Sequence, residues 1–509
     1  MTPFNKSTQG SEKTVNFEGD LAFNMGPREA LYALACTSSL RPKFYVPEVA
    51  NELKRLRALI KRVPAEFVAK LAVYVREKMY LRTMPLVLAV ELCRVHKGDD
   101  LVRRTVRRVI KRADELAEIL AYFAAAEDRI SRDPRSKILN RLPKQLRLGL
   151  ADAFNTFDAY QLAKYDRETA IRLRDVMFLV HPKPKDASQA EIFKRLAEQR
   201  LETPYTWETE LSAKGNKKET WEGLIDSGKV GYMALLRNLR NILRAGVSKN
   251  HLKAVCDKIS NSVEVAKSRQ LPFRYFSAYV EISGSDQAVF EKAAVLLALE
   301  AATLASIVNV AISEERVVVA CDFSGSMQHN VSEKSVIQNL DIGIVLGALL
   351  KSNRKTAVVG IFGDEWKVID FPPGNILGNC LAMRRRIGEV GYSTNGHLAV
   401  EWAIANKIEA DRFCIFTDCQ LWDSTWDLPV RGLRISGYGA MNDAWNKYQA
   451  LYPKARLTLF DLTGYGTTPI SLRRRDVTLI AGWSDKVFDA LAAIERGEEA
   501  VSEVEKMEI

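Results

Sequence analysis

The stretch VVVACDFSGSM, residues 317–327, decides how the second half of the chain folds. Its five leading apolar residues predict a short buried β-strand, which ends abruptly in Asp322, Ser324 and Ser326. Gly325 lets the backbone turn tightly, so these alternate side chains can direct three oxygens toward one point. One carboxylate and two hydroxyls suit a hard divalent cation, and Mg²⁺ is the expected ion.

Strands and helices alternate along the chain from Arg316 onward. Further apolar strands are expected at residues 356–362, 412–418, 455–462 and 477–483. Helices are expected between them, at residues 335–352 and 395–407. Short apolar strands that alternate with amphipathic helices are typical of an α/β doubly wound parallel sheet, in which ligands bind at the carboxyl ends of the strands.

Neighbouring loops at the same edge offer two more oxygen ligands. Thr394 lies just before an expected helix, and Asp418 ends an expected strand. The alternative is that Asp322 and the serines only cap a helix. The second hydroxyl and the later carboxylate favour a metal site made of Asp322, Ser324, Ser326, Thr394 and Asp418.

The same loop also invites comparison with aspartyl-phosphate phosphatases. Those enzymes place a nucleophilic Asp at the end of a first strand and need a second Asp two residues later as acid and base. Ser324 occupies that second position, so the nucleophile would lack its proton shuttle. No catalytic residue is therefore assigned, and the protein is not expected to be an enzyme.

The five ligand candidates resemble the metal-ion-dependent adhesion site of von Willebrand factor A domains. The resemblance covers about residues 314–495, and all five positions of the motif have a match. It implies a divalent cation held by these residues, with a partner's carboxylate often completing its coordination. It also implies a domain that binds rather than catalyses.

The pattern before residue 310 is helical and contains almost no strand signal. Apolar residues recur at helical spacing in residues 46–62, 63–80 and 83–96, and each segment has a proline near its start. Successive helices joined by short turns predict an α-solenoid of paired helices. No clean sequence repeat supports this interpretation, which rests on the density and spacing of the helices.

Charge is divided unevenly between the two parts of the chain. Residues 1–310 carry a net charge of +15 and residues 311–509 a net charge of −4, which gives +11 for the whole. Six cations line one half of a helix expected at residues 101–113, as either a solvated face or a phosphate track. A second basic group, residues 144–183, interleaves cations with Tyr160 and Tyr165, which can stack on unpaired bases.

Several segments of the helical half resemble the TROVE domain of Ro ribonucleoproteins: NFEGDLAFNM, PAEFVAKLAVYVREKMYLR, KYDRETAIRLRDVMFLVHPKPK and GKVGYMALLRNLRNIL. The resemblance implies a monomeric ring of HEAT-like repeats (residues 1–310) closed by the A domain (residues 311–509). It also implies binding of small noncoding Y-like RNAs on the outer ring and of single-stranded ends of misfolded RNAs in the hole. A role in RNA quality control follows, with a 3′-exonuclease as a further partner.

The resemblance also suggests which residues contact RNA. The basic Y RNA-binding segment of the family matches Lys164 and His181, whereas one further basic position falls on Glu168, where Arg167 could substitute. Candidates for the hole are cations elsewhere in the helical half. The full set of expected RNA-binding residues is Lys144, Arg147, Lys164, Arg167, Arg172, Arg174, His181, Arg237 and Arg240.

Two other functions remain open at this point. The first is a metal-dependent protein-interaction module whose basic half is an incidental surface, and the second is a Mg²⁺-dependent phosphohydrolase. Residues 293–312 are expected to form a buried helix and linker rather than a membrane span, because Glu300 and Asn309 interrupt them. The polar N-terminus and the seven scattered cysteines are typical of a cytoplasmic protein with reduced thiols.

Overall fold

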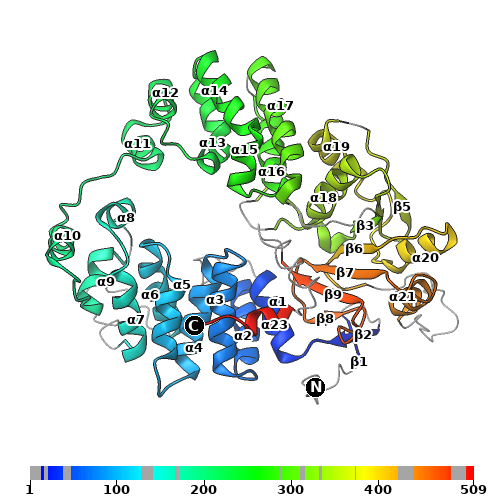
Figure 1. Cartoon of the computed structure of the whole chain (residues 1–509), viewed down its shortest axis with the longest axis horizontal. Coiled ribbons are helices and arrows are strands. Elements are labelled where there is room, and N and C mark those ends of the chain that lie inside the picture. Colours follow the sequence, from blue (N-terminus) through cyan, green and yellow to red (C-terminus); the bar gives the residue numbers. More distant parts are fainter. Residues whose placement is uncertain are drawn as a thin grey trace. The chain divides into compact units, whose positions relative to one another are not determined.

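The computed structural model describes most of the chain (Figure 1). The described residues are 13–16, 21–37, 47–127, 142–166, 169, 171–286, 289–309, 316–331, 335–372, 374–421, 439–482 and 500–509. They form two compact units that interleave along the sequence. One unit combines Met1–Thr37 with Lys214–Gly497, and the other combines Ser38–Ala213 with Glu498–Ile509.

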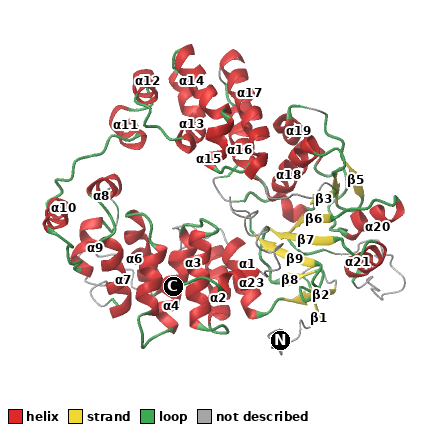
Figure 2. Ribbon diagram, viewed as in Figure 1, coloured by secondary structure: helices red, strands yellow, loops and turns green. Residues whose placement is uncertain are grey.

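The second of these units is helical and confirms the predicted run of helices (Figure 2). Pro47 opens its first helix and Pro64 caps its second, where a missing N–H costs nothing. Its helices are α2 (Pro47–Ile60), α3 (Ala65–Glu77), α4 (Thr83–Val95), α5 (Leu101–Val109), α6 (Asp114–Ala126), α7 (Lys144–Phe154), α8 (Ala159–Tyr165), α9 (Leu173–Val180), α10 (Ala187–Ala197) and α11 (Trp207–Lys214).

Close packing joins these helices across their buried faces. The pairs α3–α4 and α5–α7 share the largest contacts. A side chain at Gly149 would lie 2.8 Å from the carbonyl oxygen of Arg103, so glycine there lets α7 approach α5 closely. The chain also returns to this unit at its far end, where α23 (Ala500–Glu505) packs on α3 and buries Val504 completely.

The other unit begins its helical part with α12 (Lys218–Asp226), α13 (Tyr232–Ala245), α14 (Lys249–Ser260), α15 (Ser262–Ser268), α16 (Pro272–Ser283) and α17 (Val289–Ala305). Helix α17 corrects the expectation of a buried helix at residues 293–312. Val295 and Leu299 are buried against neighbouring helices, but Leu297 on the opposite face is 70% exposed. The error arises because a run of apolar residues all around a helix hides which face lacks a neighbour. Of the described helices, none is long and apolar enough to cross a membrane.

A six-stranded sheet forms the centre of the A domain, with the order β5-β4-β3-β6-β7-β9. All pairings are parallel except that of the edge strand β5, so the doubly wound parallel sheet is confirmed. The strands are β3 (Val317–Asp322), β4 (Val358–Phe362), β5 (Trp366–Val368), β6 (Arg412–Thr417), β7 (Arg456–Asp461) and β9 (Val477–Ala481).

Helices cover both faces of this sheet, which is why its central strands are apolar on both sides. Helices α20 (His397–Ala405) and α21 (Ala440–Leu451) pack on one face around Phe413 and Trp445. Helix α18 (Asn339–Asn353) packs on β3 and β6, and α19 (Ile376–Met383) packs beside α18. Glu300 of α17 accepts hydrogen bonds from the backbone N–H groups of Leu377 (2.8 Å) and Gly378 (3.2 Å) at the start of α19.

Three short strands outside the main sheet were not expected. Strands β1 (Lys13–Val15) and β2 (Leu21–Asn24) form a hairpin, and β2 pairs with β8 (Thr467–Thr468) of the A domain. Helix α1 (Pro27–Thr37) follows and packs beside β9. Strand β2 and helix α1 therefore contact the A domain. The division at residue 310 and the closure of the helices into a ring stay predictions.

Close packing of α18 on the sheet leaves no space for a side chain at Gly343. A Cβ at Gly343 would lie 2.8 Å from Sγ of Cys321 and 3.0 Å from Cβ of Phe416. We therefore expect Gly343→Val to destabilise the protein by about 1–3 kcal/mol, because neither neighbour belongs to a side chain that can swing away. Urea unfolding measures this loss. Gly223→Ala on α12 is the control, since nothing lies within 4 Å of its Cβ position, and an equal loss in both variants would contradict the packing argument.

Candidate metal site and basic surface

The DFSGS loop lies at the carboxyl edge of the central strand β3. Asp322 is the last residue of β3. Strand β3 lies between β4 and β6, and β6 ends at Thr417. This is the point where the strand order reverses direction, since the chain leaves β3 toward β4 and later returns to β6. Open parallel sheets bind their ligands at such a switch point.

Hydrogen bonds hold the carboxylate of Asp322 in a fixed orientation. Its Oδ1 accepts from the backbone N–H of Ser324 at 2.9 Å, and its Oδ2 accepts from the hydroxyl of Thr417 at 2.7 Å. The hydroxyl oxygens of Ser324 and Ser326 lie 3.2 Å apart. The predicted convergence of these three side chains on one loop is therefore present in the structure.

The remaining two candidates approach from neighbouring loops. Asp418 follows β6 directly, interacts with the hydroxyl of Ser326 and accepts from the backbone N–H of Gln420 at 3.0 Å. Thr394 donates its hydroxyl hydrogen to the carbonyl oxygen of Gln420 at 2.9 Å. The loops thus bring together the five residues that the sequence singled out, although their role as metal ligands stays a prediction.

Two buried carboxylates of like charge dominate the electrostatics of this edge. Asp322 is 0% and Asp418 is 1% exposed, and neither forms an ion pair with a cation among the described residues. Burial, followed by the charge of Asp418, raises the pKa of Asp322, and burial also raises the pKa of Asp418. A bound cation would remove the cost of burying both charges.

The donor set fits a hard divalent cation. The described residues contain no cluster of three or more His, Cys, Asp or Glu side chains. The predicted ligands are two carboxylates and three hydroxyls. Oxygen-only sets with few carboxylates suit Mg²⁺, which retains water molecules in its coordination sphere. Thr417 was missed by the sequence interpretation, and its position one residue before Asp418 at a strand end was the available signal.

The basic surface lies on α7, α8 and α9 of the helical unit. Tyr165 ends α8, and two cations face its ring: the guanidinium of Arg112 at 4.7 Å and the ammonium of Lys164 at 5.7 Å from its centroid. Lys164 also lies 3.8 Å from a carboxylate oxygen of Glu208. Its charge is therefore partly balanced within the protein.

Other expected RNA contacts lie on the same helices. His181 caps α9 in a left-handed conformation (φ 49°) and is exposed, whereas Arg172 and Arg174 are half-buried at the start of that helix. Lys144 is exposed and Arg147 half-buried on the first turn of α7. Two exposed aromatic side chains accompany these cations: Tyr160 (51% exposed) and Phe178 (51% exposed).

The remaining candidates separate from this group. Arg167 lies outside the described residues. Arg237 and Arg240 belong to α13 in the other compact unit, where Arg237 is exposed and Arg240 lies 2.6 Å from Glu281. Residue-by-residue roles in RNA binding stay predictions for all of them.

The basic helix at residues 101–113 proves to be largely neutralised. Arg103 pairs with Asp152 at 2.5 Å, and Arg108 and Lys111 share Glu77 at 3.2 and 3.0 Å. The guanidinium of Arg108 also donates to the carbonyl oxygen of Glu508 at 2.6 Å. These partners lie outside the helix, so the sequence of the helix alone did not reveal them. Because most of its cations are paired within the protein, the helix does not form the open phosphate track that was one of the two interpretations.

Comparisons with known proteins agree with this architecture. The family model of the TROVE domain matches residues 46–200 and 194–340, and that of the Ro60 vWA domain matches residues 316–434. The RNA-binding protein RO60 of Deinococcus radiodurans is 21% identical over 399 residues, which cover 69% of this chain and 72% of that protein. The crystal structure of the Deinococcus radiodurans RO (RSR) protein superposes with a TM-score of 0.61 at 17% identity and covers 93% of this chain and 100% of that chain.

A second group of relatives is much longer. Telomerase protein component 1 is 26% identical over 336 residues in Rattus norvegicus and 28% identical over 352 residues in Mus musculus. These matches cover 49% and 52% of this chain. The chain spans only 12% and 13% of the length of those two proteins.

The fold and the matched domains together define the class: a helix-rich protein that carries a von Willebrand factor A domain. The matched TROVE segments cover more than half of the sequence, and the Ro60 vWA segment follows them in order. The chain belongs to the Ro family of TROVE-domain proteins.

The buried carboxylate pair generates a prediction for the metal-free protein. Because the pKa of Asp322 is raised, the folded state keeps a proton that the unfolded chain has already lost above about pH 4. Stability should therefore fall as pH rises from that value through the raised pKa. In EDTA, Asp322→Asn should gain at least about 1 kcal/mol over the wild type between pH 5 and pH 8, since a tenfold change in proton affinity is worth about 1.4 kcal/mol.

Thermal unfolding at the two pH values measures this difference. The hydroxyl of Thr417 can accept a hydrogen bond from the new amide, so the substitution conserves the local contacts. The control is Asp370→Asn, which changes an exposed carboxylate of the same domain. If the gain in stability of Asp322→Asn were the same at both pH values, the pKa of Asp322 would not be raised in the folded state.

Proposed function

We propose that this protein binds RNA through the cations of α8 and α9, and through a second set of cations on α7 and α13. The observation that carries the proposal is that Lys164, Arg172, Arg174 and His181 lie on α8 and α9, the same helices that expose the rings of Tyr160 and Phe178. Cations attract phosphates of any sequence, and exposed rings can stack on unpaired bases. The name of the Deinococcus relative, an RNA-binding protein, supports the same function.

The RNA partners are proposed from the family resemblance. Small structured Y-like RNAs would contact the surface around Lys164 and His181, and single-stranded ends of misfolded RNAs would use a second set of cations. Lys144, Arg147, Arg237 and Arg240 are the candidates for that second set. In this proposal the protein serves RNA quality control or processing in the cytoplasm, together with a 3′-exonuclease.

The A domain has a separate proposed role. Asp322, Ser324, Ser326, Thr394 and Asp418 would hold a divalent cation, most suitably Mg²⁺, and the cation would present an open position to a carboxylate of a partner protein. The buried, like-charged Asp322 and Asp418 support this proposal because a cation is the simplest compensation for both. Ser324 supplies no acid or base, so binding is proposed instead of phosphate-ester hydrolysis.

RNA binding should depend steeply on salt and divide between two surfaces. Affinity should fall at least about tenfold between 50 and 200 mM salt, because each neutralised phosphate releases counterions. Replacing Lys164 and His181 with Ala should weaken a structured small RNA about tenfold more than a single-stranded 3′ tail. Reversal of Lys144, Arg147, Arg237 and Arg240 to Glu should show the opposite selectivity.

Gel-shift titrations of both variants with both RNAs at two salt concentrations test these expectations. The control variant, Lys78→Ala with Lys218→Ala, removes two exposed cations from α3's end and α12. Equal losses for both RNAs in both variants would contradict separate surfaces. Binding that ignores salt would contradict a mechanism led by phosphate contacts.

The metal proposal has its own test. Asp322→Ala removes one of two carboxylates from the site and should abolish Mg²⁺ or Mn²⁺ binding in calorimetry, while RNA affinity stays within about twofold of the wild type. Asp370→Ala, which removes an exposed carboxylate of the same domain, should bind the cation normally. Undiminished cation binding by Asp322→Ala would show that Asp322 is not a ligand of the cation. Metal-dependent hydrolysis of a phosphate ester that is lost in Asp322→Ala would replace it with an enzymatic one.

A further inference from the structure

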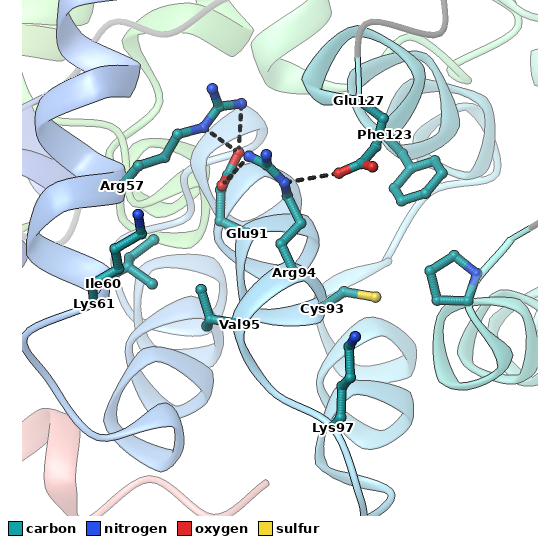
Figure 3. A pocket seen from close by; sticks show the side chains of 11 residues that line it. Arg57, Ile60, Lys61, Glu91, Cys93, Arg94, Val95, Lys97, Phe123 and Glu127 are labelled. Atoms are coloured by element: carbon teal, nitrogen blue, oxygen red, sulfur yellow. Dashed lines mark hydrogen bonds and ion pairs between the residues drawn. The ribbon is translucent and has the colours of Figure 1, made fainter.

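A cavity of about 410 Å³ opens on the helical unit, at the ends of α2, α4 and α6 (Figure 3). It is separate from the residues proposed above for RNA and for metal. Its size is that of a small-molecule site and far exceeds the space that a single phosphate ion fills. The residues that line it are Arg57, Ile60, Lys61, Glu91, Cys93, Arg94, Val95, Lys97, Phe123, Glu127 and Pro143.

A buried carboxylate organises the polar part of this cavity. Glu91 is only 2% exposed, and it accepts hydrogen bonds from Nε of Arg57 (3.0 Å), a terminal nitrogen of Arg94 (2.9 Å) and the hydroxyl of Tyr122 (2.6 Å). Arg94 also donates from Nε to Glu127 at 2.9 Å. Figure 3 shows both guanidinium groups converging on Glu91. Each guanidinium has five N–H donors, so both retain donors after these bonds.

Two lysines then leave the cavity with an excess of positive charge. Four cations (Arg57, Lys61, Arg94, Lys97) face two carboxylates (Glu91, Glu127), which gives a net charge of +2. Cations near helix ends commonly balance the helix dipole, and Arg57 and Arg94 have that role in addition to holding Glu91. Lys61 and Lys97 lie beyond the ends of α2 and α4 and are exposed. Neither forms an ion pair with a residue that the structure describes.

The rest of the wall is apolar. Val95, which is 46% exposed, supplies the accessible hydrocarbon, whereas Ile60 and Phe123 line the cavity but are each only 2% exposed. Figure 3 shows Lys61 and Lys97 on opposite sides of Val95. Cys93 belongs to the same wall. Burial raises the pKa of its thiol to about 11, so the thiol is neutral. An apolar centre with one cation on either side suits a flat uncharged group that carries an anion at both ends.

We propose that this cavity binds one nucleotide of a single-stranded RNA, with the nucleoside against the apolar wall and its two adjoining phosphates near Lys61 and Lys97. Each phosphodiester carries one negative charge, so the two phosphates match the net charge of the cavity. Contact with any base is allowed, because every base has a flat face. The inference rests on the proposed RNA binding and adds a site that the cations of α7–α9 and α13 do not include.

Adenosine 3′,5′-bisphosphate is the probe that isolates this site, since it carries a phosphate on each side of one nucleoside. Calorimetry on the full chain should show it binding more tightly than adenosine 5′-monophosphate, and adenosine and inorganic phosphate binding weakest. Lys61→Glu combined with Lys97→Glu should weaken the bisphosphate at least tenfold. Lys78→Glu combined with Lys218→Glu, which reverses two exposed lysines elsewhere, should leave its affinity within twofold.

A second variant acts on the wall instead of the charges. Val95→Asp places a carboxylate at an exposed wall position (Val95 is 46% exposed) and should also weaken the bisphosphate at least tenfold without lowering the melting temperature. Short single-stranded oligonucleotides should lose affinity in the same two variants. Inorganic phosphate binding as tightly as the bisphosphate, or equal losses in the cavity and control variants, would overturn the proposal.

The failures of the two proposals are distinguishable. If RNA shifts in gels but the wild type does not bind the bisphosphate, the cavity assignment is wrong and RNA binding by the other surfaces stands. If no RNA shifts while the bisphosphate binds and is lost in Lys61→Glu with Lys97→Glu, the site holds a free nucleotide and the claim about RNA is overturned.

Discussion

The parallel pairing of β3 with β6 is the constraint on which the A domain depends. It aligns Cys321 with Phe416, so the two strands end at the same edge and their next residues, Asp322 and Thr417, meet in a hydrogen bond. A slip of one residue between the two strands would place the side chains of Asp322 and Thr417 on opposite faces of the sheet. The close approach of α18 at Gly343 depends on the same register, because its neighbours are Cys321 and Phe416. Packing and site geometry therefore share one cause.

The chemical character of that edge follows from what surrounds it. Helices on both faces exclude water from the strand ends, so two carboxylates there have raised pKa values. The helical unit treats buried acid differently. Glu91 is as well hidden, but it is surrounded by two guanidinium groups and a phenol that compensate its charge. The contrast separates an acid whose charge is compensated by neighbouring side chains from two acids whose compensation is proposed to come from a cation.

Local patterns in the sequence were enough to predict the helices of residues 47–95, the parallel strands and the loop with Asp322. Each of these depends on neighbours within a few residues, such as a proline before a helix or an oxygen side chain after a strand. Interactions between distant residues were not predictable. The cations of α5 form ion pairs with Glu77 and Asp152, which lie far from them in the sequence. The hairpin of β1 and β2 is too short to be stable without β8. Helix α17 was misjudged for the same reason, since its neighbours decide which face is covered.

The interleaving of the two units has a consequence for how the protein is made. Asn16 donates to the carbonyl oxygen of Leu421, a residue 405 positions later, and α23 docks on α3 from the opposite end of the chain. During synthesis the first segment leaves the ribosome long before β8 and β9 exist, so it must wait unpaired while the helices between them fold. Such non-local closure is slow and exposes apolar surface to aggregation. Strands β1 and β2 are therefore exposed to aggregation during the interval before β8 is made.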